Sequence, residues 1–191
     1  MKKYIYLSFF VFAIYSCGSN DDAKIKVTKP EVIKGNDLNT YEGRVSEIEK
    51  YTKLIYDDSL NFNKDYAEKL LTVYDLFIAK DSYYNISKDY MFKAGEICKA
   101  LDRPYDAIKY FNMLLEKDPK DKNAGAALFY KALIIGDVLH ENELAKQTYQ
   151  EFIDKYPNDP LVEGAKASIQ LQGKTLDEIV KGFKEKEKKK V

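Results

Sequence analysis

The chain has 191 residues, of which 45% are hydrophobic and 32% charged, a composition typical of a water-soluble protein of one modest domain. Its 31 basic and 31 acidic side chains cancel, so it lacks the basic excess with which proteins bind nucleic acids, and we predict no nucleic-acid partner. One histidine and two cysteines, Cys17 and Cys98, are too few for a histidine–cysteine zinc site or a disulfide framework, so we predict no metal site.

Residues 1–16 have the layout of a secretory signal peptide. Lys2 and Lys3 precede an apolar run from Tyr4 to Tyr15, which Ser8 alone interrupts. This run is about a dozen residues long, whereas a transmembrane helix needs roughly 20. We therefore predict a cleaved signal and not a permanent membrane span.

The end of this segment, Ile14-Tyr15-Ser16-Cys17, resembles the lipobox of bacterial lipoproteins. The resemblance implies that Cys17 receives lipid and anchors the chain to the outer membrane, with the periplasmic face favoured over the cell surface. The alternative is an ordinary secretory signal in which Cys17 is incidental.

Residues 17–40 are polar and show no apolar period, so we predict that they form a disordered tether that begins at the lipidated cysteine. Within it, Asp21 and Asp22 resemble the acidic tethers by which Bacteroidota sort some lipoproteins to the cell exterior. The alternative, which we favour, is a plain solvated linker.

From Tyr41 onward, apolar residues recur at spacings of three and four, which is the period of an amphipathic α-helix. Alternating β-branched residues are absent, and short segments with Asp, Asn, Gly and Pro separate the apolar stretches. The pattern predicts an all-α fold. We expect helices over residues 42–57, 64–79, 87–101, 104–117, 124–139, 142–155, 160–171 and 175–188.

The middle of the chain contains an internal repeat with a shift of 38 residues. In each copy a small residue is followed four residues later by an aromatic residue and twelve residues later by a proline. This spacing resembles the tetratricopeptide repeat, in which small residues let two helices cross closely and proline ends the second helix. The repeat positions are Gly95, Ala107, Phe111 and Pro119 in one copy, and Ala132, Ala145, Tyr149 and Pro157 in the other.

The resemblance implies a tetratricopeptide-like right-handed α-solenoid of antiparallel helix pairs over residues 41–188. The clear repeats lie at about 88–121 and 126–159, with degenerate units on either side.

The two copies differ by one residue in the spacing between their helices. Ala132 lies thirteen residues before Ala145, whereas the first copy has a spacing of twelve. We prefer Ala132 to Leu133 as the close-contact position and expect the extra residue in the turn around His140. Two registers that differ by one residue are therefore possible for the helix expected over residues 124–139.

The C-terminal end has the signals of a capped array. Asp159-Pro160 has the pattern of a helix start, and Thr175 to Glu178 is a capping box that opens a last amphipathic helix. A solenoid needs such a helix to cover its last open face. For the basic tail at residues 184–191, a solvated end and a lipid-binding element are alternatives, and we favour the first. The apolar face of the last helix consists of Leu176, Ile179, Val180 and Phe183.

The sequence contains none of the common motifs for phosphate binding, zinc-dependent hydrolysis or acyl transfer. His140 falls in a predicted turn, where a solvent-facing histidine is the simpler interpretation. Cys98 has no free partner once Cys17 carries lipid, so we expect a buried apolar residue. We therefore predict no enzyme activity, no catalytic residue, no cofactor and no small-molecule substrate.

In a solenoid of this kind, the first helix of each pair lines the face that receives an extended peptide or a partner's helix. The first repeat would present Phe92, Glu96 and Lys99 there, and the second repeat Phe129 or Tyr130, depending on register. The lysine–asparagine clamp of some family members is not recognisable, because Phe92 and Glu96 stand in its place.

Six tyrosines, among them Tyr130, are candidates for partner anchors, because aromatic residues are enriched at interface hot spots. The alternative is that they wedge between helices of a chain without tryptophan, and we expect this for about three in four of them. The candidates are Tyr83, Tyr84, Tyr105, Tyr110, Tyr130 and Tyr149.

A lipid-anchored tetratricopeptide array of this size resembles two groups of envelope proteins. One is the lipoprotein of the β-barrel assembly complex of the outer membrane, and the other is the periplasmic coordinator of the Tol-Pal system. The resemblance implies a non-catalytic adaptor that holds envelope proteins together, and we favour the β-barrel assembly role because of the lipid. A Tol-Pal-type coordinator and a surface-exposed binding lipoprotein are the alternatives.

Overall fold

The computed structural model describes residues 37–56 and 61–188. The predicted signal peptide, the predicted lipidation site Cys17 and the tether up to residue 36 lie outside the described residues, as do residues 189–191 of the basic tail. Within the described ranges, no helix is both long enough and apolar enough to cross a membrane.

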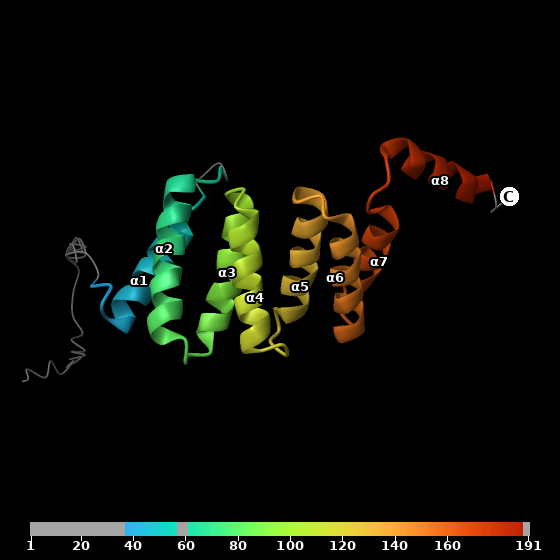
Figure 1. Cartoon of the computed structure of the whole chain (residues 1–191). Coiled ribbons are helices and arrows are strands. Elements are labelled where there is room, and N and C mark those ends of the chain that lie inside the picture. Colours follow the sequence, from blue (N-terminus) through green and yellow to red (C-terminus); the bar gives the residue numbers. More distant parts are fainter. Residues whose placement is uncertain (1–36, 57–60, 189–191) are drawn as a thin grey trace, which may run out of the picture. The chain divides into compact units, whose positions relative to one another are not determined.

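Eight α-helices follow one another along the described residues (Figure 1). These residues form no strand, and their single β-bridge joins Tyr56 to Phe62 in the connection between the first two helices. The prediction of an all-α fold is therefore confirmed. The helices are α1 (Tyr41–Leu54), α2 (Lys64–Asp81), α3 (Ile86–Ala100), α4 (Pro104–Lys117), α5 (Ala124–Leu133), α6 (Asn142–Lys155), α7 (Val162–Leu171) and α8 (Leu176–Lys188), with a π-helical turn, η1 (Ile134–Val138), directly after α5.

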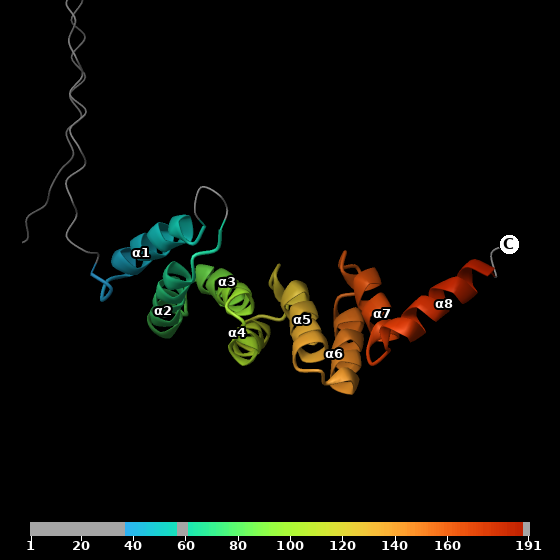
Figure 2. The ribbon, with the colours of Figure 1, turned by 90° about the horizontal axis from the view of Figure 1, so that it is seen from above.

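Successive helices pack side by side in pairs, α1 with α2, α3 with α4 and α5 with α6, and α7 packs on α6. Figure 2 shows the first helices α1, α3, α5 and α7 on one side of the row, and α2, α4 and α6 on the other. This is the arrangement of a tetratricopeptide-like solenoid, so the predicted fold class is confirmed.

Small residues let paired helices approach closely. Gly95 lies directly against Phe111: a Cβ atom built on Gly95 would collide with the ring, whose Cδ1 would be 2.8 Å away. Ala107 is fully buried in the same helix pair, as are Ala132 and Ala145 in the next pair. A larger residue at these positions would force the helix axes apart.

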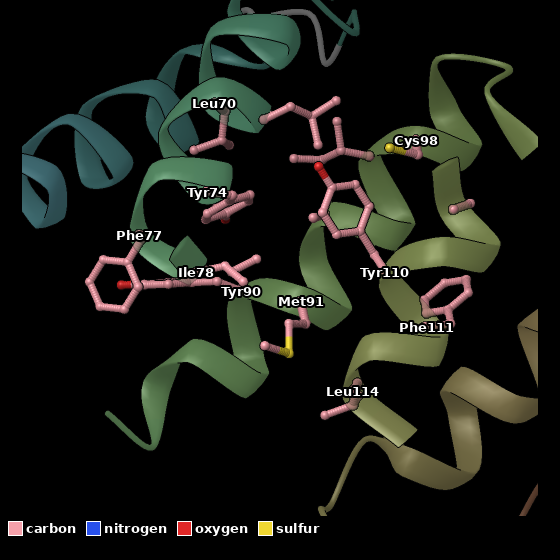
Figure 3. Packing of buried hydrophobic residues seen from close by; sticks show 14 of the residues in the cluster. Leu70, Tyr74, Phe77, Ile78, Tyr90, Met91, Cys98, Tyr110, Phe111 and Leu114 are labelled. Carbon is pink, nitrogen blue, oxygen red and sulfur yellow. The ribbon is translucent and has the colours of Figure 1, made fainter. Parts of the chain in front are cut away.

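Buried hydrophobic side chains form two clusters, one mainly between α1 and α4 and a smaller one between α5 and α7. Figure 3 shows the first cluster, in which Tyr74 and Tyr90 stack with their ring centroids 5.0 Å apart and Phe77 meets Tyr90 edge-on at 4.8 Å. Cys98 is fully buried in this cluster, as expected for an apolar residue, and burial raises the pKa of its thiol to about 12.

The extra residue of the second repeat lies in η1. There the N–H of Leu139 donates to the carbonyl of Ile134 at 3.0 Å, five residues back instead of four. Our expectation of an insertion in the turn around His140 was therefore wrong. The reason is packing. One more residue in a regular α-helix would rotate all following side chains by roughly 100° about the helix axis. The wider π turn absorbs this residue and keeps Ile134 and Ile135 both buried.

A buried ion pair holds the first helix pair together. Nε of Arg44, in α1, donates to Oδ2 of Asp81, at the end of α2, at 2.6 Å, and both side chains are only 4% exposed. The hydrogen bond to Asp81 raises the pKa of Arg44. Nη1 of Arg44 also donates to the carbonyl of Leu38 at 2.7 Å, so the turn before α1 packs against the helix pair.

The starts of the two C-terminal helices differ: α8 (Leu176–Lys188) has a side-chain cap, whereas α7 (Val162–Leu171) has none. α7 starts at Val162, two residues after its predicted start, because Asp159 first accepts from the N–H of Leu161 at 2.8 Å in a preceding turn. The capping box of α8 is confirmed: Oε2 of Glu178 lies 2.8 Å from the backbone nitrogen of Thr175. Pro119 and Pro157 are exposed and follow the ends of α4 and α6.

Candidate protein-binding surface

Three of the residues predicted to contact a partner meet between α3 and α5. The rings of Phe92 and Tyr130 stack with their centroids 6.2 Å apart, and they lie 5.8 and 6.1 Å from the ring of Phe111. Nζ of Lys99 lies over the Tyr130 ring, 3.6 Å from its centroid. Phe92, Lys99 and Tyr130 are each only partly exposed, so they join the two helix pairs as well as facing outward.

The ammonium group of Lys99 is paired with an aromatic face instead of a carboxylate. Burial lowers its pKa, and the negative charge of Glu96 acts in the opposite direction. A cation over a ring gains about 0.5–1 kcal/mol at exposed sites and more when it is desolvated. The contact with Tyr130 therefore offsets part of the cost of burying this charge.

Phe129 lies inside the second helix pair and not on the outer side of this cluster. Its ring meets Tyr149 and Phe152 of α6 edge-on, with ring centroids 5.5 and 5.7 Å apart. On another side it faces Gly164 of α7, where an added Cβ would be 3.8 Å from the ring. Phe129 is thus a wedge between α5, α6 and α7, and Tyr130 is the residue that joins Phe92.

Glu96 is exposed and borders an apolar groove of about 280 Å³, which we call the α1–α3 groove. Within the part of the chain that the structure describes, neither Glu96 nor its neighbour Lys93 at this groove has an ion-pair partner. The remaining walls come from α1, the α1–α2 connection, α2 and α3. They are Thr52, Ile55, Tyr56, Phe62, Leu70, Tyr74, Ile97 and Ala100.

Sequence reasoning placed only Glu96 at this groove and missed its other walls. α1 carries no repeat motif, and Phe62 reaches the groove through the bridge that pairs it with Tyr56. The one usable signal was the presence of these two aromatic residues on either side of a polar connection. That Tyr56 and Phe62 share a groove with α3 follows only from the packing of the helices.

The other tyrosines divide into wedges and exposed side chains. Tyr110 and Tyr149 are buried, and Oη of Tyr110 donates to Oδ1 of Asp75 at 2.5 Å. Tyr83, in the connection between α2 and α3, is 75% exposed, and Tyr105, in the first turn of α4, is 74% exposed. The buried tyrosines therefore stabilise the array, whereas the exposed ones leave ring surface available for a partner.

The described residues include no group of three or more His, Cys, Asp or Glu side chains placed to hold a metal ion. His140 is exposed in the turn after η1, with a φ angle of 58°. What the first-helix side does offer is an apolar groove with charges at its edge and a half-buried aromatic cluster beside it. These are features of a surface that binds another protein.

A protein-family model described as tetratricopeptide repeat matches residues 126–159, which comprise most of α5, η1, α6 and the turn that follows. Residues 126–159 are a tetratricopeptide repeat. The repeat predicted at these positions is thereby confirmed. A search of the curated proteins returned no match to the chain. Tetratricopeptide repeats typically act as non-enzymatic scaffolds that mediate protein–protein interactions.

Proposed function

We propose that the chain is a non-catalytic adaptor that binds another protein through the α1–α3 groove and the aromatic cluster beside it. The groove is the observation that carries the proposal, because its apolar walls can bury a hydrophobic side chain of the partner. Lys93 and Glu96, which lack ion-pair partners within the described part of the chain, would fix the orientation of the bound segment.

The groove is tested by placing a photocrosslinking amino acid at Lys93, on α3, and at Lys109, an exposed matched position on α4. We expect a specific crosslinked product from position 93 and none from position 109. Ala100→Trp, which fills the groove from its exposed wall, should remove the product and leave the thermal unfolding midpoint unchanged. Equal crosslinking from both helices would contradict the proposal.

We also propose that Cys17 carries lipid and anchors the protein in the outer membrane, facing the periplasm. The lipobox-like segment Ile14-Tyr15-Ser16-Cys17 supports this. Cys17→Ala should move the protein from the membrane fraction to the soluble fraction, whereas Ser19→Ala should leave it in the membrane. Protease treatment of intact cells then separates the periplasmic orientation, in which the protein is protected, from the cell surface.

For the cellular role we propose a part in β-barrel assembly, with Tol-Pal-type coordination as the competing assignment. The lipobox-like segment that ends at Cys17 and the short helical array support both. Mass spectrometry of the product crosslinked at position 93 distinguishes them: components of the β-barrel assembly complex support the first, and Tol-Pal proteins in their absence favour the second.

A further inference from the structure

The last helix, α8, leaves an apolar stripe uncovered. Leu176 is 75% exposed and Val180 41%, and Leu171 at the end of α7 is 40% exposed. In the preceding pairs, the corresponding second helices α4 and α6 bury Phe111 and Phe152 completely. The helix at the red end of the ribbon in Figure 1 therefore does not cover its apolar residues as its predecessors do.

Local signals nevertheless define α8 well. Gly173 adopts a φ angle of +79° and ends α7, and Thr175 and Glu178 cap the start of α8 with reciprocal hydrogen bonds. A helix of 13 residues is marginal in water without tertiary contacts, even when its ends are capped. A partner that covers Leu176 and Val180 would stabilise it.

The charges along α8 indicate what this partner is. Acidic Asp177 and Glu178 lie in its first turn, and Lys181 and Lys184 follow toward the other end. Asp177 and Lys184 are seven residues apart, so both flank the apolar stripe on the same side. Neither has an ion-pair partner within the described part of the chain.

We propose that two copies of this chain associate through α8, with the two helices antiparallel about a two-fold axis. Antiparallel pairing places the acidic end of each helix beside the basic half of the other, so Asp177 of one copy faces Lys184 of the second, and the same pair forms twice. Val180 of each copy then lies next to the two-fold axis, between the two ion pairs, and Leu176 extends the apolar contact just beyond each of them. The association does not depend on which protein the α1–α3 groove binds.

The contact is small. A helix of 13 residues is about 20 Å long, so the interface is shorter than that of a standard permanent complex. Association is therefore weak and reversible. An anionic membrane surface fits this helix less well, because Asp177 flanks the apolar stripe and would meet like charge.

The pairing is tested with the full chain in a mild non-ionic detergent, by sedimentation velocity at concentrations up to about 100 µM, where a weak interface is populated. Wild type should form dimers. Asp177→Lys and Lys184→Glu should each weaken self-association by roughly tenfold, because each places like charges opposite one another twice. An equimolar mixture of the two variants should restore dimers, since both flanking contacts become attractive in the mixed pair.

Glu185→Lys is the matched control, because it makes the same charge change on the face of α8 roughly 180° from the apolar stripe. It should leave association unchanged. Val180→Asp should abolish dimers without shifting the thermal unfolding midpoint of the array. A wild type that stays monomeric, or a mixture that associates no better than its components, overturns the proposal; these are also the results that a membrane-bound or solvated α8 would give.

Discussion

At the scale of single residues, Gly95 shows how the repeat pattern acts. We predict that Gly95→Ala lowers the free energy of unfolding by about 1–2 kcal/mol, because the collision with the buried Phe111 ring outweighs the better helix propensity of alanine. Urea unfolding followed by circular dichroism measures the change. Gly164→Ala is the control: its Cβ meets Phe129 at an ordinary 3.8 Å, so it should be neutral or stabilising. Equal losses in both variants would contradict the close contact.

The ion pair between Arg44 and Asp81 gives a second prediction at this scale. Asp81→Asn leaves the buried guanidinium without its counter-charge and should cost about 3–5 kcal/mol of unfolding free energy. Replacing both members, Arg44→Met with Asp81→Leu, should cost much less, because no charge then stays buried. Thermal and urea unfolding of the single and double variants measure this. A double variant as unstable as Asp81→Asn would show that the ion pair itself, and not the unpaired charge, decides stability.

These two residue contacts differ in how far the sequence predicts them. The approach of Gly95 to Phe111 follows from the repeat spacing, because the same small and aromatic positions recur in the second copy. Arg44 and Asp81 lie 37 residues apart in a helix pair without a repeat motif. Their contact depends on how α1 rotates against α2, which hydrophobic spacing does not fix.

At the scale of the helices, the start of α4, of α6 and of α8 lies within one residue of its predicted position, because prolines, acidic residues and the capping box mark the starts locally. The π turn was not predictable in this way. Its sequence, Ile134 to Val138, continues the apolar period of α5, and only the burial of Ile134 and Ile135 together requires the wider turn.

The π turn predicts an unusual tolerance to deletion. Removing Asp137, which is exposed, brings Ala132 to twelve residues before Ala145, the spacing of the first repeat. The chain should stay folded and lose about 1 kcal/mol, mainly the hydrogen bond between Asp137 and Gln172. Circular dichroism at 222 nm and the thermal midpoint measure the outcome.

Deletion of Lys93 from the middle of α3 is the matched control. α3 has no π turn, so this deletion rotates every later residue of the helix by roughly 100° and should unfold the first cluster. If removal of Asp137 were as damaging as removal of Lys93, the extra residue would not be stored in η1.

At the scale of the whole molecule, the described helices contact mainly their neighbours along the chain, and their buried residues form two clusters. The sequence predicted this array and one stripe of its binding surface. It did not predict the α1–α3 groove, because Ile55, Phe62 and Ile97 meet there from three segments that no single period connects. A site between neighbouring helix pairs needs the stacking geometry, whereas the helices themselves do not.

Neighbour-only packing predicts that a core defect remains local. Phe152→Ala removes a fully buried ring from the second cluster and should lower the local free energy of unfolding of its helices by about 3–5 kcal/mol. Because stability in a solenoid is a sum over units and their interfaces, protection of backbone amides should fall in α5, α6 and α7 and change little in α1 and α2. Native-state hydrogen exchange measured by NMR resolves these helices separately.

Phe77→Ala supplies the mirror-image control, because Phe77 is equally buried but belongs to the first cluster. It should lower protection in α1 to α3 and leave α6 and α7 nearly unchanged. If either substitution lowered protection equally from α1 to α7, the array would unfold as one cooperative unit. A partner bound in the α1–α3 groove would then stabilise α7 as strongly as α3, whereas with local unfolding its effect should fade along the row.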